Sequence, residues 1–206
     1  MRPTKIVCVG RNYVAHAREL GNELPERPLL FLKPPSSLIG DGAAIVLPGE
    51  SARVEHEAEI GVVIERRARH VSEADALGIV RGWVPLNDVT ARDLQSTDGQ
   101  WTRAKGFDTF CPVGPLTPLA DAPDWSALEV VARVNGTERQ RGRASDMAFG
   151  IPNLLAYITG IMTLEPGDIV ATGTPEGVGP LVPGDEVEIE LPGLGRVRNV
   201  VTGARS

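Results

Sequence analysis

The stretch Val54-Glu55-His56-Glu57-Ala58-Glu59-Ile60-Gly61-Val62-Val63-Ile64 decides the fold, because acidic residues lead directly into an apolar, β-branched run. In a β-strand, residues two apart share a face, so Glu57 and Glu59 should project together. The opposite face would then carry Ala58, Ile60 and Val62, preceded by His56, which we expect to be packed in the core or to support a ligand residue from behind. Like charges on one face repel each other, and a bound cation would turn that repulsion into coordination. Carboxylate oxygens suit hard cations such as Mg²⁺ and Mn²⁺.

A third carboxylate would complete such a cation site, and Asp88 is the best candidate. It ends the apolar run Trp83-Val84-Pro85-Leu86-Asn87-Asp88, which places it at the mouth of the core. The same spacing also fits a solvated acidic face on an edge strand that binds no metal. Spacing alone favours this second interpretation, since acidic side chains are usually exposed.

Further β-branched and apolar runs predict a chain made mainly of strands. Glycine occurs 23 times and proline 17 times, which is typical of many turns between short strands. Helical patterns are few, and Pro152 should kink or split the longest of them. The expected strands cover residues 5–9, 29–32, 58–64, 82–88, 130–134, 169–171, 187–191 and 197–201, and the expected helices 12–20, 72–80, 90–95 and 145–162. We predict a β-rich α+β fold in one unit.

Length and composition limit the classes of function. The 206 residues fit one domain, and 42% hydrophobic with 23% charged residues is ordinary for a globular protein. A net charge of −6, only 4% aromatic residues and the lack of a basic stripe argue against nucleic-acid binding. We expect no secretory signal and no membrane helix, which needs about 18 apolar residues, and therefore a cytoplasmic location. Cys8 and Cys111 are expected to be reduced core residues.

Six segments, in their order and spacing, resemble the fumarylacetoacetate hydrolase family, especially its short acylpyruvase and fumarylpyruvate hydrolase members. They are Val9-Gly10-Arg11-Asn12-Tyr13 with His16 and Glu19, Leu30-Phe31-Leu32-Lys33-Pro34, His56-Glu57-Ala58-Glu59, Asp88-Val89-Thr90-Ala91-Arg92-Asp93-Leu94-Gln95, Lys105-Gly106-Phe107-Asp108-Thr109-Phe110 and Thr172-Gly173-Thr174-Pro175-Glu176-Gly177-Val178-Gly179. The resemblance implies a mixed β-sandwich or β-roll. It also implies one catalytic domain over residues 1–206, with a lid near residues 11–25, and a homodimer.

The resemblance further implies that Glu57, Glu59 and Asp88 bind Mg²⁺ or Mn²⁺. Glu55 stands where close relatives often carry a histidine, and it is not counted among the ligands. His16 and Glu19 lie three apart, on one face of a helix, which alone fits a surface histidine beside an acidic neighbour. The matching family positions form a lid dyad, in which Glu19 would orient His16 as a general base for water.

Three other residues gain a role from the resemblance. A lone lysine is usually exposed, but Lys105 would offset the charge of the carboxylates and hold a substrate oxygen. Gln95, one helical turn after Ala91, would donate its amide to the substrate. Thr174 follows Gly173 in a loop that alone could be a plain turn, and it would also bind substrate.

Together these residues predict a metal-dependent enzyme acting on a small 2-oxo acid. The first choice is hydrolysis of a C–C bond in acylpyruvates such as fumarylpyruvate, which yields pyruvate and a carboxylic acid. Oxaloacetate decarboxylation, and isomerisation or decarboxylation of 2-hydroxyhepta-2,4-diene-1,7-dioate, pass through a similar enolate and stay open. A binding protein without catalysis is the alternative of another class. The His16–Glu19 pair argues against it, since binding needs no general base.

Overall fold

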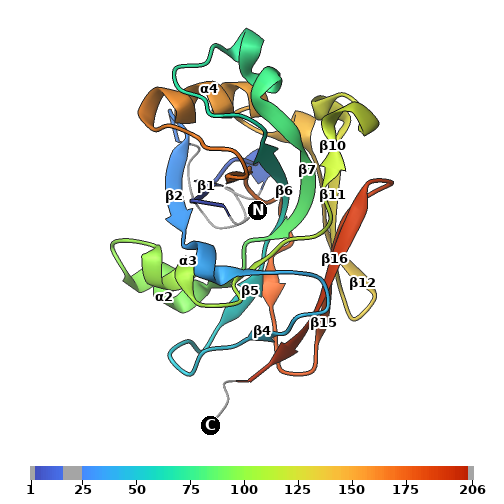
Figure 1. The fold of residues 1–206 in the computed structure, drawn as a ribbon. Helices are drawn as coiled ribbons and strands as arrows, with labels where there is room; N and C mark the ends of the chain where they lie inside the picture. The colour runs from blue at the N-terminus through green and yellow to red at the C-terminus, as the bar shows by residue number, and fades with distance from the viewer. Residues whose placement is uncertain (1–2, 16–24, 204–206) are drawn as a thin grey trace.

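The computed structural model describes residues 3–15 and 25–203, and it is built mainly from strands with short helices outside them (Figure 1). The larger sheet has the strand order β10-β7-β6-β13-β1-β2. Its strands are β1 (Ile6–Gly10), β2 (Leu29–Lys33), β6 (Ala58–Ile64), β7 (Val80–Asn87), β10 (Thr117–Pro118) and β13 (Ile169–Ala171). A second sheet has the order β12-β11-β15-β16-β4. Its strands are β4 (Ile45–Val46), β11 (Glu129–Val134), β12 (Thr137–Arg143), β15 (Glu186–Leu191) and β16 (Gly195–Thr202).

The two sheets pack face to face through β6 and β7 on one side and β11, β15 and β16 on the other. Ala58, Ile60 and Val62 are buried in the core between them, whereas Val63 belongs to a smaller apolar cluster. The predicted alternation along this strand is therefore confirmed. Since β6 pairs with β7 and β13, the interpretation as an edge strand is wrong.

Every predicted strand is present, with ends that differ by a few residues at most, and the β-rich α+β class is confirmed. The sequence patterns miss β12, because its two buried positions are Gln140 and Gly142 and the others are polar and exposed. They also miss short strands in two further small sheets. These are β5 (Val54–His56), β8 (Thr90–Ala91) and β14 (Gly179–Pro180), and β3 (Leu38–Ile39) with β9 (Cys111–Pro112).

The helices are shorter than predicted. Residues 145–162 do not form one kinked helix, because α4 (Ile151–Ile161) begins just before Pro152, where a missing N–H costs nothing. Ser72 caps a 3₁₀ helix over Glu73–Ile79, where an α-helix was expected. The 90–95 segment starts as β8 and continues as α2 (Arg92–Thr97), followed by the unpredicted α3 (Thr102–Gly106). The predicted helix 12–20 lies largely outside the described residues.

Over residues 3–15 and 25–203, no helix is long and apolar enough to cross a membrane. Cys8 and Cys111 are both buried and free, as expected. Burial raises the pKa of the Cys111 thiol to about 12, so it stays protonated at neutral pH.

Asp168 joins the start of β1 to the turn before β13. Its carboxylate accepts from Lys5 Nζ at 2.5 Å, from the Thr4 hydroxyl at 2.7 Å and from the Glu165 N–H at 2.8 Å. Burial alone would raise the pKa of Asp168, but the hydrogen bonds from Lys5, Glu165 and Thr4 lower it overall. The charged form of Asp168 therefore stabilises the fold.

We expect Asp168→Asn to lower the free energy of unfolding by about 1.5–3 kcal/mol, the usual worth of hydrogen bonds to a charged group. The pKa of Asp168 is lower in the folded than in the unfolded chain, so its contribution is present at neutral pH and is lost as the pH falls through the folded pKa. Urea unfolding at neutral and acid pH should therefore show a difference that shrinks in acid. The exposed pair Asp98–Arg103 supplies the control, and equal losses in Asp98→Asn would contradict the prediction.

Candidate active site

The acidic stretch 54–64 forms two strands that meet at Glu57, rather than one regular strand. β5 pairs with β8 and β14, whereas β6 pairs with β7 and β13. At the junction, the Glu57 N–H donates to Asn87 Oδ1 at 3.0 Å, and the Glu57 carbonyl accepts from the Asp88 N–H at 2.9 Å. The end of β7 is thus fixed against the junction, which brings Asp88 to Glu57.

Glu57, Glu59 and Asp88 gather in one buried cluster. Each offers a carboxylate oxygen within 4.8 Å of the other two. Their exposed fractions are 4%, 1% and 0%, so the interpretation as a solvated acidic face is wrong. Burial, together with the charges of Asp88 and Glu57, raises the pKa of Glu59 well above its usual value. Three buried carboxylates of this kind require positive charge beside them.

Two buried lysines supply part of that charge. Lys105, on α3, places its Nζ 2.7 Å from Glu57 Oε2 and 2.6 Å from Asp88 Oδ2. Burial disfavours its charged form, yet the Asp88 and Glu57 carboxylates raise its pKa overall. Lys33, at the end of β2, contacts the other Asp88 oxygen at 2.5 Å and the Val89 carbonyl at 3.1 Å. The sequence reasoning missed Lys33, although a lysine that closes an apolar strand was a usable signal, since buried lysines need partners.

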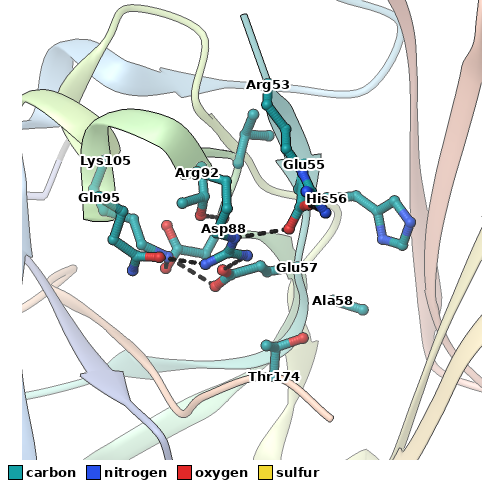
Figure 2. Close-up of polar contacts among 12 residues, drawn as sticks. Arg53, Glu55, His56, Glu57, Ala58, Asp88, Arg92, Gln95, Lys105 and Thr174 are labelled. Carbon is teal, nitrogen blue, oxygen red and sulfur yellow. Dashed lines mark hydrogen bonds and ion pairs between the residues drawn. The ribbon is translucent and has the colours of Figure 1, made fainter. Parts of the chain in front are cut away.

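Arg92 joins the cluster from the start of α2 (Figure 2). Its guanidinium lies 2.5 Å from Glu57 Oε1 and 2.7 Å from Glu55 Oε2, and it also donates to Gln95 Oε1. Arg53 binds the other oxygen of Glu55 at 2.7 Å. Glu55 is therefore held by two arginines and stands outside the carboxylate cluster, as the sequence indicated. Arg92 was missed, although it lies one helical turn before Gln95.

The loop after β13 closes the other side of the cluster. Gly173 adopts φ +98°, and its N–H donates to Glu59 Oε2 at 2.8 Å. A Cβ at this position would lie 2.7 Å from the Cβ of Asn12, so only glycine fits. The next residue, Thr174, is 3% exposed, and its hydroxyl accepts from Gln140 Nε2 at 2.8 Å.

The carboxylate cluster and several of its neighbours line a cavity of about 490 Å³, which is the size of a small-molecule site. Its polar floor includes the carboxylate cluster, Lys105, Gln95 and Thr174. Its apolar wall includes Phe31 and Trp101, whose ring centroids lie 5.3 Å apart. Lys105 Nζ lies 5.1 Å from the centroid of the Phe31 ring, so its charge also faces an aromatic surface.

Two of the three histidines, His16 and His56, were considered for the site from the sequence. His56 is buried and its ring points away from the carboxylate cluster, as predicted for a packed histidine (Figure 2). Its Nδ1 lies 2.9 Å from Gln140 Oε1, and burial lowers its pKa. The predicted dyad of His16 and Glu19, like most of the predicted lid, lies outside the described residues.

A family model described as "Fumarylacetoacetate (FAA) hydrolase C-terminal" matches residues 5–202. The chain belongs to the fumarylacetoacetate hydrolase family. The mitochondrial oxaloacetate tautomerase FAHD1 of Oryza sativa subsp. japonica is 48% identical over 198 residues, which is 93% of this chain and 86% of that protein. The crystal structure of 5-carboxymethyl-2-hydroxymuconate delta-isomerase from Mycobacterium smegmatis matches with a TM-score of 0.92 and 44% sequence identity. The match covers 100% of this chain and 81% of the isomerase chain.

A third similar protein of the family carries a metal. It is a fumarylpyruvate hydrolase from Pseudomonas aeruginosa, solved in complex with Mn²⁺ and pyruvate. It is 29% identical, with a TM-score of 0.92, and covers 97% of this chain and 90% of that one. The named relatives in this fumarylacetoacetate hydrolase family are thus enzymes that include a tautomerase, an isomerase and a hydrolase.

The carboxylate cluster of this family member fits a divalent cation. All its donors are oxygens, which suits Mg²⁺ or Mn²⁺ better than a thiophilic metal. In the structure, the Lys105 ammonium contacts both Glu57 and Asp88 and offsets part of their negative charge. Binding of Mg²⁺ or Mn²⁺ by this chain stays a prediction, which a titration with each ion tests.

Proposed function

We propose that this protein is a divalent-metal-dependent enzyme that forms and stabilises the enolate of a small 2-oxo dicarboxylic acid, with keto–enol tautomerisation of oxaloacetate as its reaction. The observation that carries the proposal is buried Lys105 beside Glu57 and Asp88 at the floor of the cavity. A fixed positive charge beside such a cluster is suited to an oxygen that becomes negative during the reaction. The 48% identity to an oxaloacetate tautomerase supports this choice of reaction.

The charges at the site favour a substrate with two negative charges. Four buried carboxylates and four cationic side chains interact there, so their formal charges cancel. They are Glu55, Glu57, Glu59 and Asp88, with Lys33, Lys105, Arg53 and Arg92. A divalent cation adds two positive charges, which a dicarboxylate neutralises and a monocarboxylate does not.

The proposed roles follow from the positions of the side chains. Glu57, Glu59 and Asp88 would hold the ion, which when bound supplies a Lewis acid for the 2-oxo group. Lys105 would donate a hydrogen bond to the enolate oxygen and keep its own proton, because its neighbours raise its pKa. His16, the base predicted from the sequence, would carry the proton that moves between the enol oxygen and carbon 3. Gln95 and Thr174 line the same cavity and would orient the substrate carboxylates.

Acylpyruvate hydrolysis, the first choice from the sequence, is the second candidate. It is favoured by the similarity to the fumarylpyruvate hydrolase and by the spacing of His16 and Glu19. Hydrolysis needs a general base for water, and within the described residues no histidine lines the cavity. His16 would supply that base, just as it would carry the proton in the tautomerisation. The homodimer, the cytoplasmic location and the single catalytic domain over residues 1–206 stay predictions.

A substrate panel with Mn²⁺ separates the two candidates. We expect enol-to-keto conversion of oxaloacetate, followed by ultraviolet absorbance, to have a kcat/KM at least about tenfold above that for cleavage of fumarylpyruvate, which is about 1.4 kcal/mol in the barrier. Acetylpyruvate and 2-hydroxyhepta-2,4-diene-1,7-dioate complete the panel, and metal-free enzyme is the control. Faster cleavage of fumarylpyruvate would favour the hydrolase instead, and turnover of none of them would leave a binding protein.

A further inference from the structure

Gln140 does not line the cavity, yet it contacts both the threonine loop and the acidic junction. It lies in the middle of β12 and is 1% exposed. Its Nε2 donates to the Thr174 hydroxyl and to the Pro175 carbonyl, both at 2.8 Å. Its Oε1 accepts from the Ala58 N–H at 3.0 Å and lies 2.9 Å from His56 Nδ1. All four hydrogen-bonding positions of the amide are therefore used.

The backbone partners of Gln140 fix the direction of its amide. The Ala58 N–H can only donate and so faces Oε1, whereas the Pro175 carbonyl can only accept and so faces Nε2. Thr174 Oγ1 must then accept from Gln140, which leaves its own proton for another partner. Among the residues that the structure describes, the acceptor found for that proton is the Pro175 carbonyl, which is 3.5 Å away and thus long for a hydroxyl donor. Since Thr174 lines the cavity, its proton is available to a bound anion.

The two acceptor bonds of Gln140 have a second consequence. His56 and Ala58 are the residues on either side of Glu57, and Gln140 Oε1 binds both. One amide therefore holds the strand junction that carries Glu57 and the loop that carries Thr174 at a fixed separation. β12 belongs to the second sheet, so the contact crosses from one sheet to the other.

We propose that Gln140 is a positioning residue, which fixes Thr174 so that the threonine hydroxyl donates a hydrogen bond to an anionic group of the substrate. The inference rests on the proposed function, because it takes Thr174 as a residue that binds substrate. Gln140 acts through Thr174 and does not touch the substrate itself.

A double-mutant cycle on the Mn²⁺-loaded enzyme tests the proposal. Calorimetry first measures the Mn²⁺ affinity of each variant, and then the affinity of the Mn²⁺-loaded variant for oxalate. We expect Gln140→Met and Thr174→Val each to weaken oxalate binding about tenfold or more, as for one hydrogen bond to a charged group. The double variant should bind no more weakly than Thr174→Val alone. Independent, multiplying effects, or a loss explained by weaker Mn²⁺ binding, would overturn the proposal.

Asn199 supplies the matched control, because it is 2% exposed and its amide donates to the Gly40 and Ala43 carbonyls at 3.0 and 2.8 Å. Asn199→Met removes the same kind of buried amide, so it should lower the melting temperature and leave oxalate binding unchanged. If Gln140→Met does not fold, Gln140→Glu keeps the side-chain volume and the acceptor for Ala58 while removing the donors to Thr174. We expect the same loss of oxalate binding from it.

Failure of the proposed function can be told apart from failure of this inference. Wild-type enzyme that binds no oxalate with Mn²⁺, and turns over none of the panel, would refute the proposed function. Crystal structures of the wild type and of the Gln140 variant then decide the positioning role. A Thr174 side chain that turns to a new rotamer supports it, and an unchanged Thr174 rotamer overturns it.

Discussion

Glu59→Gln should abolish Mn²⁺ binding and lower kcat/KM by about 10³-fold, since a metal commonly contributes several kcal/mol to transition-state stabilisation. Glu59 is 1% exposed and lies near the start of β6, where its carboxylate is part of the cluster with Glu57 and Asp88. Isothermal titration with Mn²⁺ measures the binding, and the oxaloacetate assay measures the turnover.

The same substitution should make the metal-free protein more stable. In the folded chain, burial and the neighbouring Asp88 and Glu57 raise the pKa of Glu59. An acid whose pKa is raised on folding destabilises the folded state as the pH rises through its unfolded value, and glutamine removes that cost. Loss of metal binding with a higher melting temperature of the metal-free protein would identify Glu59 as a residue kept for its ligand rather than for the fold.

Glu55→Gln is the matched control for Glu59→Gln. Glu55 is also about 1% exposed, but it is bound by Arg53 and Arg92 and lies outside the carboxylate cluster. Its replacement should lower stability, because it removes the carboxylate that binds Arg53 and one of the two carboxylates that bind Arg92. It should leave Mn²⁺ binding nearly unchanged. If Glu55→Gln lost Mn²⁺ as completely as Glu59→Gln, the assignment of the metal site to Glu57, Glu59 and Asp88 would be wrong.

The strands that carry this site could be predicted from the sequence because their apolar residues alternate or run together. Ala58, Ile60 and Val62 on β6 show this directly, since each one lies in the core between the sheets. β12 could not be found in this way, because Gln140 is buried for its hydrogen bonds and not for its hydrophobicity. The break at Glu57 was also hidden, since it depends on a bond to Asn87 from another strand.

In the candidate site, too, some residues could be predicted from the sequence and others could not. The resemblance to a family pointed to Glu57, Glu59, Asp88 and Lys105, and the structure brings these four side chains into one cluster. It did not point to Lys33 or Arg92, whose importance depends on charge balance. A lysine or arginine is exposed in most sequence contexts, so only the three-dimensional position of Asp88 and Glu57 shows that these cations must be buried beside them.

Lys105→Met should lower kcat by about 10²–10³-fold, the usual loss when one donor to a developing oxyanion is removed. The substitution also leaves Glu57 and Asp88 without the ammonium that now bridges them. In the metal-free protein we therefore expect a loss of about 3–5 kcal/mol of stability, as for other broken buried ion pairs. Saturating Mn²⁺ should restore much of this stability, because the ion binds only the folded chain, but it should not restore kcat.

Lys33→Met separates the two effects of Lys105, which are the stabilisation of the enolate oxygen and the neutralisation of buried carboxylates. Lys33 is as buried as Lys105 and binds the same carboxylate, but it approaches Asp88 from β2 and is not among the described residues that line the cavity. Its loss should destabilise the metal-free protein to a similar degree, yet lower kcat by less than about tenfold, because no donor to the substrate is removed. Thermal unfolding with and without Mn²⁺, together with kcat for oxaloacetate, compares the two variants. Equal losses of kcat would mean that Lys105 acts only by neutralising Asp88 and Glu57, and that the enolate oxygen is stabilised without it.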